Sequence, residues 1–244
     1  MAGAIAENYR RLGGAQKGRA RGAPAYSVYV NRKIGRVLAA LAHGWGWTPN
    51  VVSAVSALHT YTAIVLLMAV PRSWWLGVVV AVLLALGYAW DSADGQVARL
   101  RGGGSVAGEW LDHFLDAIKH ATLHPAVLIG LWLYSDLRNT WWLVIPLLYG
   151  AIVVVTFFGM LLNDLLKGKK GLPSTHARGG GSALRSLVVL PTDYGVLCWV
   201  FVLWGWTSAF LAAYGALMAM NGVFIILASV KWFREMTAID RQAA

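Results

Sequence analysis

The sequence predicts an all-α, polytopic membrane protein with six transmembrane helices and an amphipathic helix at the membrane surface before them. Of the 244 residues, 58% are hydrophobic and only 13% are charged, and the mean hydropathy is +0.57. Because an ordinary soluble domain carries roughly 25% charged residues, this composition excludes a typical water-soluble globule and a disordered chain. The apolar residues are also gathered in long runs, as they are in helical membrane proteins.

Six of these runs are long enough to span a bilayer, which takes about 20 helical residues. They lie at about 51–70, 74–91, 109–134, 141–165, 187–204 and 208–231. The connections between several of them are short, which favours antiparallel neighbouring helices. We therefore expect a flexible basic N-terminus (1–25), a juxtamembrane amphipathic helix (26–46), a six-helix transmembrane catalytic domain (47–234) and a C-terminal tail (235–244).

The segment before the first run has the pattern of an interfacial helix. Its apolar residues recur at helical spacing, at Val30, Ile34, Val37, Leu38 and Leu41. Its cations occupy other faces of the same helix. This pattern predicts a helix that lies in the membrane surface. Whether it also covers the entrance of an active site is a second interpretation that stays open.

The distribution of Lys and Arg predicts the orientation. These residues are concentrated in 1–50, 92–108, 166–186 and the C-terminal end, whereas Arg72 and Arg138 lie on the opposite side. Cytoplasmic loops of membrane proteins carry an excess of such cations. We expect a multi-pass protein of the cell membrane with both termini in the cytoplasm. The net charge of +10 is then mostly a topology signal, and no nucleic-acid partner is expected.

Four carboxylates stand at the ends of two adjacent predicted spans. Asp91 and Asp94 are three residues apart, Asp112 and Asp116 are four apart, and each pair shares a helix face. The glycines at 102–104 let the chain reverse, so that the two faces can meet. Converging carboxylates at the edge of a low-dielectric slab repel one another, and oxygen ligands suit Mg²⁺, Mn²⁺ or Ca²⁺ rather than zinc or copper. We expect Mg²⁺ first, with Mn²⁺ as the alternative, and two ions.

Such ions would bind phosphate oxygens and neutralise the charge that develops in phosphoryl transfer. The small residues Gly95, Ala98 and Gly108 leave room for a ligand to approach the backbone, and Arg99 supplies a fixed charge for phosphate. The alternative is a small cation transporter or channel in which the aspartates line the path. An ion path has no need of these glycines and this arginine at fixed positions.

The pattern Asp91-x2-Asp94-Gly95-x2-Ala98-Arg99-x8-Gly108-x3-Asp112-x3-Asp116 resembles the signature of the CDP-alcohol phosphotransferase family at every position. The resemblance implies a metal-dependent membrane enzyme that moves a phosphate-linked alcohol from a CDP-alcohol to an acceptor hydroxyl and releases CMP, in phospholipid or glycolipid synthesis. It implies that Asp91, Asp94 and Asp112 are metal ligands and that Asp116 is a base with some metal contact. It also implies a cytidine diphosphate cradle of Asp94, Gly95, Ala98, Arg99 and Gly108, and a homodimer.

The branch of the family stays open. Gly108-Glu109-x2-Asp112-His113-x2-Asp116 resembles the choline and ethanolamine phosphotransferases, whereas Arg101-Gly-Gly-Gly-Ser105 resembles the phosphatidylinositol-phosphate synthases. The donor is therefore either CDP-diacylglycerol or a CDP-linked polar alcohol, and the acceptor hydroxyl is either lipid or polar.

Further polar residues give weaker predictions. His113 is the rival of Asp116 as the catalytic base, and Asp116 is preferred. Lys119, Arg178 and Arg185 are candidates for binding the acceptor or a phosphate, although the loop that holds the two arginines is equally explained by the excess of cytoplasmic cations. His120 and His124 follow Asp116 on one helix face. A polar cavity wall is preferred there over a zinc site.

Overall fold

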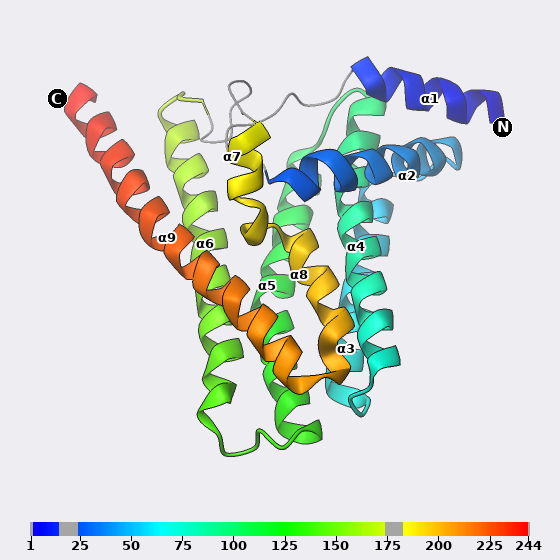
Figure 1. The fold of residues 1–244 in the computed structure, drawn as a ribbon. Coiled ribbons are helices and arrows are strands. Elements are labelled where there is room, and N and C mark those ends of the chain that lie inside the picture. The colour runs from blue at the N-terminus through cyan, green and yellow to red at the C-terminus, as the bar shows by residue number, and fades with distance from the viewer. Residues whose placement is uncertain (1, 15–23, 174–182, 244) are drawn as a thin grey trace.

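The computed structural model describes residues 2–14, 24–173 and 183–243, and in these residues it is all-helical, as the sequence predicts (Figure 1). Four stretches are long and apolar enough to cross a membrane. They are α3 (Pro49–Ala69), α4 (Trp74–Leu100), Trp141–Lys169, which contains α6 (Val144–Lys169), and Thr207–Arg241 of α9 (Thr207–Ala243). The prediction of a multi-pass membrane protein is confirmed.

The other two predicted spans look different. Helix α5 (Val106–Tyr134) has the length to cross a bilayer, but its N-terminal half is rich in charged residues and histidines. The stretch 187–204, predicted as one span, is not one continuous helix. It consists of the end of α7 (Ala183–Val188), a 3₁₀ turn, α8 (Tyr194–Val200) and a 3₁₀ segment that ends at Gly205.

The break in that stretch has a local cause. Pro191 lies in the 3₁₀ turn, where its missing N–H cannot continue a helical ladder. Asp193 then starts α8 anew, because its carboxylate accepts a hydrogen bond from the Gly195 N–H at 2.9 Å. The apolar composition of 187–204 predicts a single span and does not reveal this capping signal.

Two helices lie across one end of the bundle, α1 (Ala2–Gly14) and α2 (Arg32–Gly44), as Figure 1 shows. Helix α2 is the predicted amphipathic helix, with Ile34 and Val37 on its exposed face. Helix α1 corrects the prediction of a flexible N-terminus for residues 2–14, whereas residues 15–23 lie outside the described part of the chain. Leu12 is fully buried against α2 and α4, and the Arg36 guanidinium stacks on the Tyr9 ring and donates to its carbonyl at 2.8 Å.

The turn between α4 and α5 makes the reversal that the glycines predict. Gly102 and Gly103 have φ values of +95° and +142°, which residues other than glycine rarely adopt. Ser105 then caps α5, since its hydroxyl accepts from the Gly108 N–H at 3.0 Å. The C-terminal end of α4 and the N-terminal end of α5 are thereby placed next to each other.

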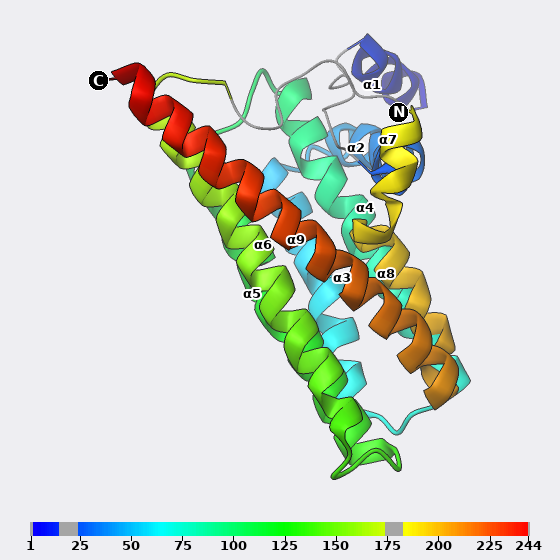
Figure 2. The same ribbon diagram turned by 60° about the vertical axis from the view of Figure 1, so that its left-hand side comes forward.

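The main apolar core is shared by α3, α4, α5, α6, α8, the 3₁₀ segment Phe201–Gly205 and α9, and its largest fully buried side chains are Trp204, Tyr214, Phe201 and Phe210. Figure 2 shows α9 running obliquely across the bundle, from the end of α8 towards the C-terminal end of α6. Lys167 of α6 and Glu235 of α9 form an ion pair at 2.6 Å, which ties these two ends together.

Candidate active site

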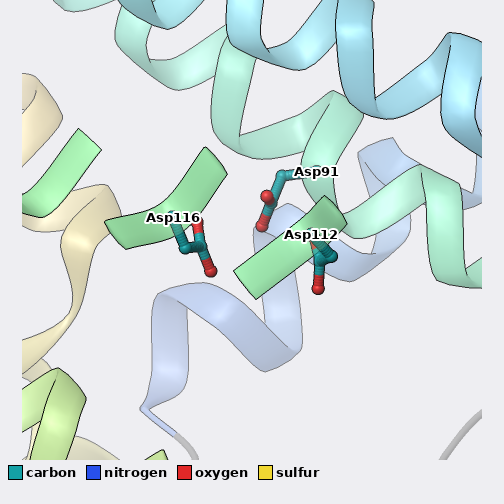
Figure 3. A group of neighbouring side chains, drawn as sticks. All are labelled: Asp91, Asp112 and Asp116. Atoms are coloured by element: carbon teal, nitrogen blue, oxygen red, sulfur yellow. The ribbon is translucent and has the colours of Figure 1, made fainter. Parts of the chain in front are cut away.

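Three of the four predicted aspartates meet at the end of the bundle that α1 and α2 cover. Asp91 comes from the last turns of α4, and Asp112 and Asp116 come from the first turns of α5 (Figure 3). One carboxylate oxygen from each lies within 4.8 Å of the others. The four-residue spacing puts Asp112 and Asp116 on one face of α5, and the glycine turn brings that face to the end of α4. The sequence predicts a convergence of four carboxylates, and the structure brings three of them together.

Asp94 is held one turn further along α4. Its Oδ2 accepts a hydrogen bond from the Ser53 hydroxyl of α3 at 2.6 Å, and its Oδ1 accepts from the Gly95 N–H. The side chain is 8% exposed. It does not belong to the group of three, and its predicted role as a ligand stays a prediction.

Ser53 is a contact that the sequence analysis missed. With Ser56 and Thr60 it forms a buried hydroxyl stripe on α3, and Ser56 donates to the Gly87 carbonyl of α4 at 2.8 Å. Small polar residues three and four apart within an apolar span were the available signal, because such residues commonly form contacts between membrane helices.

Lys119 reaches into the carboxylate cluster. Its ammonium forms an ion pair with Asp116, its residue is 8% exposed, and its Nζ lies 5.0 Å from the Tyr194 ring centroid. Lys119 and the three aspartates line a narrow cleft together with the α3 hydroxyls of Ser53, Ser56 and Thr60. A buried lysine needs such a partner to stay charged, and in return it neutralises one of the carboxylates.

The predicted cradle residues lie on the same helix ends. A Cβ atom at Gly95 would lie 3.8 Å from Nη1 of Arg99, and one at Gly108 would lie 3.4 Å from Oδ1 of Asn50 on α3. Ala98, which lies between the two glycines in the sequence, is buried. A side chain at either glycine would therefore narrow the approach to the arginine and to the N-terminus of α5.

The histidines of α5 follow the cluster into the bundle. His113 and His120 both face Phe157 of α6, with ring centroids 6.4 and 5.1 Å away. His124 is 1% exposed and its Nδ1 contacts the Tyr214 hydroxyl. Among the described residues these histidines form no metal-ligand group, so the zinc alternative gains no support. Arg178 lies outside the described residues, and Arg185 belongs to α7.

The residues present fit a hard divalent cation. Three carboxylate oxygens close to one another, supplied by two rigid helices, form an all-oxygen donor set of the kind that binds Mg²⁺, Mn²⁺ or Ca²⁺. The negative charge that they bring together exceeds what Lys119 alone offsets.

Comparison with known proteins shows the family. Residues 46–228 match the family described as CDP-alcohol phosphatidyltransferase. The chain belongs to this family. The prediction drawn from the aspartate signature is therefore confirmed at the level of the family.

Two curated relatives are phosphatidylinositol phosphate synthases. That of Corynebacterium glutamicum is 37% identical over 97 residues, which cover 40% of this chain and 37% of the relative. That of Mycolicibacterium smegmatis is 28% identical over 159 residues, which cover 65% of this chain and 61% of the relative. The matches therefore span less than two thirds of each relative.

A solved member shares the fold. The crystal structure of Mycobacterium tuberculosis phosphatidylinositol phosphate synthase in complex with manganese and citrate superposes with a TM-score of 0.50 at 21% sequence identity. The match covers 84% of this chain and 89% of that one.

Proposed function

We propose that this protein is a CDP-alcohol phosphotransferase, which moves a substituted phosphate from a CDP-alcohol onto an acceptor hydroxyl and releases CMP. The observation that carries the proposal is the convergence of Asp91, Asp112 and Asp116 in a chain of this family. Phospholipid synthesis is the proposed context, because the relatives are named for a phospholipid product.

Mg²⁺ is the proposed cofactor, with Mn²⁺ as a substitute, because the donor set is all oxygen and a family structure was solved with manganese. Asp91, Asp112 and Asp116 would hold the first ion, and Asp94 would help to hold a second. When bound, the ions supply charge neutralisation at the diphosphate.

The chain's own residues then bind and orient the substrates. Arg99 pairs with a phosphate of the donor, and Gly95 and Gly108 leave room for the nucleotide to approach the helix backbones. Asp116 accepts the proton of the attacking hydroxyl, and His113, on the adjacent face of α5, assists or orients the acceptor. Lys119 keeps the Asp116 carboxylate anionic and fixed in place.

The alternative of a cation channel fits the site less well. A path for cations would run past the ammonium of Lys119, which lies among the carboxylates. This ammonium would repel a passing cation. A site for an anionic diphosphate, in contrast, gains from a fixed positive charge.

The test is CMP release by the purified chain in Mg²⁺, with a panel of CDP-alcohols and acceptor hydroxyls. We expect release with at least one donor and one acceptor. Cation flux through proteoliposomes without CMP release from any donor would overturn the proposal in favour of a channel.

Substitution of Lys119 by methionine is expected to strengthen Mn²⁺ binding by about tenfold, because a competing cation leaves the cluster, while CMP release falls. The measurement is a Mn²⁺ titration of the purified chain without substrate. Lys119→Arg keeps the charge and serves as the control. Unchanged or weaker Mn²⁺ binding by Lys119→Met would show that the ammonium does not compete for these carboxylates.

The proposed topology has six crossings, with α5 and Tyr194–Gly205 added to the four long spans, and with α1, α2 and the active site on the cytoplasmic side. A homodimer is also proposed. The span that contains α6 is only 17% buried, which leaves an apolar face for a second copy or for lipid.

Labelling of a cysteine at position 104 tests this topology. A Cβ atom at Gly104 would meet nothing within 4 Å, and the native Cys198 is buried. We expect a membrane-impermeant maleimide to label Gly104→Cys only in inside-out vesicles. Asp136→Cys, in the loop at the opposite end, is expected to be labelled only in right-side-out vesicles. The reverse pattern would refute the orientation.

A further inference from the structure

A second cavity lies beside the carboxylate cluster and deeper in the bundle. It is bounded by α5, α6, α8 and α9 and has a volume of about 180 Å³. Its wall on α5 begins at His120, one turn beyond Asp116, and continues to His124, about 12 Å along the helix from Asp116. The proposed function does not use this cavity.

The far end of the cavity is closed by hydrogen bonds between neighbouring helices. His124 Nδ1 contacts the Tyr214 hydroxyl of α9, and Asn221 Nδ2 donates to the Tyr149 hydroxyl of α6 at 3.2 Å. These groups satisfy one another, and they fix the depth of the cavity.

The near end carries polar groups without such partners. The Tyr194 hydroxyl is buried and has no nitrogen or oxygen partner within the described part of the chain, where only the weakly bonding Cys198 thiol is in reach. The structure gives the His120 ring no hydrogen bond there either. Both residues adjoin the active site. His120 lies one turn beyond Asp116 on α5. The Tyr194 ring lies 5.0 Å from Nζ of Lys119, which pairs with Asp116. Unsatisfied polar groups in a membrane interior are costly, so a ligand that hydrogen-bonds at this end would relieve them.

The body of the cavity is apolar and offers no cation. Leu123, Val153, Phe157, Met160 and Leu197 supply its apolar side chains. The hydroxyls of Thr156 and Thr192 on the same wall already donate to backbone carbonyls at 2.7 and 2.8 Å. No Lys or Arg of the described ranges lines it, and its one carboxylate, Asp193, already accepts hydrogen bonds from two backbone N–H groups at 2.7 and 2.9 Å. An anionic ligand would lose its hydration here without gaining an opposite charge.

We propose that this cavity is the acceptor site and that it takes a neutral lipid alcohol. The hydroxyl lies between His120 and Asp116, and the apolar chain fills the space towards Tyr149. The assignment rests on the proposed function. The hydroxyl oxygen forms a bond to the phosphorus that carries the donor's alcohol, the bond from that phosphorus to the CMP oxygen breaks, CMP keeps the electron pair, and the proton passes to the Asp116 carboxylate.

Two valines of α6 provide a matched test. Val153 lines the cavity, whereas Val155 is 57% exposed on the outer face of the same helix. CMP release is measured for the full chain in nanodiscs, with CDP-diacylglycerol or CDP-choline as donor and with 1,2-dioctanoylglycerol or glycerol 3-phosphate as acceptor. We expect release to depend on dioctanoylglycerol. Val153→Phe should raise the KM for it by about tenfold or more, while Val155→Phe behaves as the wild type and donor binding without acceptor is equal in all three.

A photoreactive diacylglycerol gives a readout that needs no variant. Cross-links mapped by mass spectrometry are expected on the cavity-lining residues of α6, and cross-links confined to the outer face of α6 would overturn the assignment. Preference for glycerol 3-phosphate, or an unchanged KM in Val153→Phe, would also overturn it. Weaker binding of CDP-diacylglycerol to Val153→Phe without acceptor would assign the cavity to the donor's chains instead. Absence of CMP release from every donor in the wild type would overturn the proposed function itself.

Discussion

Replacement of Asp91 or Asp112 by asparagine is expected to reduce CMP release by about a thousandfold and to weaken divalent metal binding. Each substitution removes a negative charge and a strong oxygen ligand while it keeps the size of the side chain. Neither carboxylate forms an ion pair with a described residue, so the change leaves no buried lysine or arginine without its partner. The loss therefore reports on metal binding rather than on folding.

The measurement pairs CMP release with a Mn²⁺ titration of each purified variant. Asp136→Asn is the matched control, because that carboxylate is exposed in the loop at the other end of the bundle. It should match the wild type in both assays. Normal turnover and normal Mn²⁺ affinity in Asp91→Asn and Asp112→Asn would exclude these residues from the metal site.

Substitution of Asp116 by asparagine is expected to lower CMP release by about 10²- to 10⁴-fold, more than His113→Ala does. An alcohol is a poor nucleophile until a positioned group accepts its proton. Asp116 lies one turn beyond Asp112 on α5, in the cleft and next to the second cavity. His113 packs towards Phe157, so we assign it the assisting role.

The Lys119 ion pair complicates this comparison and also supplies its control. Asp116→Asn leaves the ammonium buried without its partner, which commonly costs about 3–5 kcal/mol of stability. The double variant Asp116→Asn/Lys119→Met removes both charges, so that neither buried group is left charged without a partner. It should remain inactive although its thermal stability recovers. If Asp116→Asn retains turnover while His113→Ala loses it, the histidine is the base.

The core of the site could be predicted because it depends on local rules. The four-residue spacing puts Asp112 and Asp116 on one face of α5, and the positive φ values at Gly102 and Gly103, which bring that face to Asp91, are those that a tight reversal requires. The contact of Ser53 with Asp94 and the ion pair of Lys119 with Asp116 depend on rotamers and on how α3, α4 and α5 pack. Spacing alone does not determine either.

The fold was predictable to the same degree. Apolar run length found the long helices, because the hydrophobic thickness of a bilayer sets that length. Run length could not show that Asp193 caps a new helix within 187–204. One proline and one capping residue are a weak signal beside a long apolar run. Helix α1 was missed because the basic residues of 1–25 outweighed the apolar residues, such as Leu12, that dock it.

The location of a bound ion tests the central claim most directly. Crystals of the full chain grown with Mn²⁺ would be measured for anomalous scattering at the manganese edge. We expect a peak coordinated by carboxylate oxygens of Asp91, Asp112 and Asp116, and we expect it to disappear in Asp112→Asn. A manganese peak bound elsewhere in the chain, with these three carboxylates free of metal, would contradict the account.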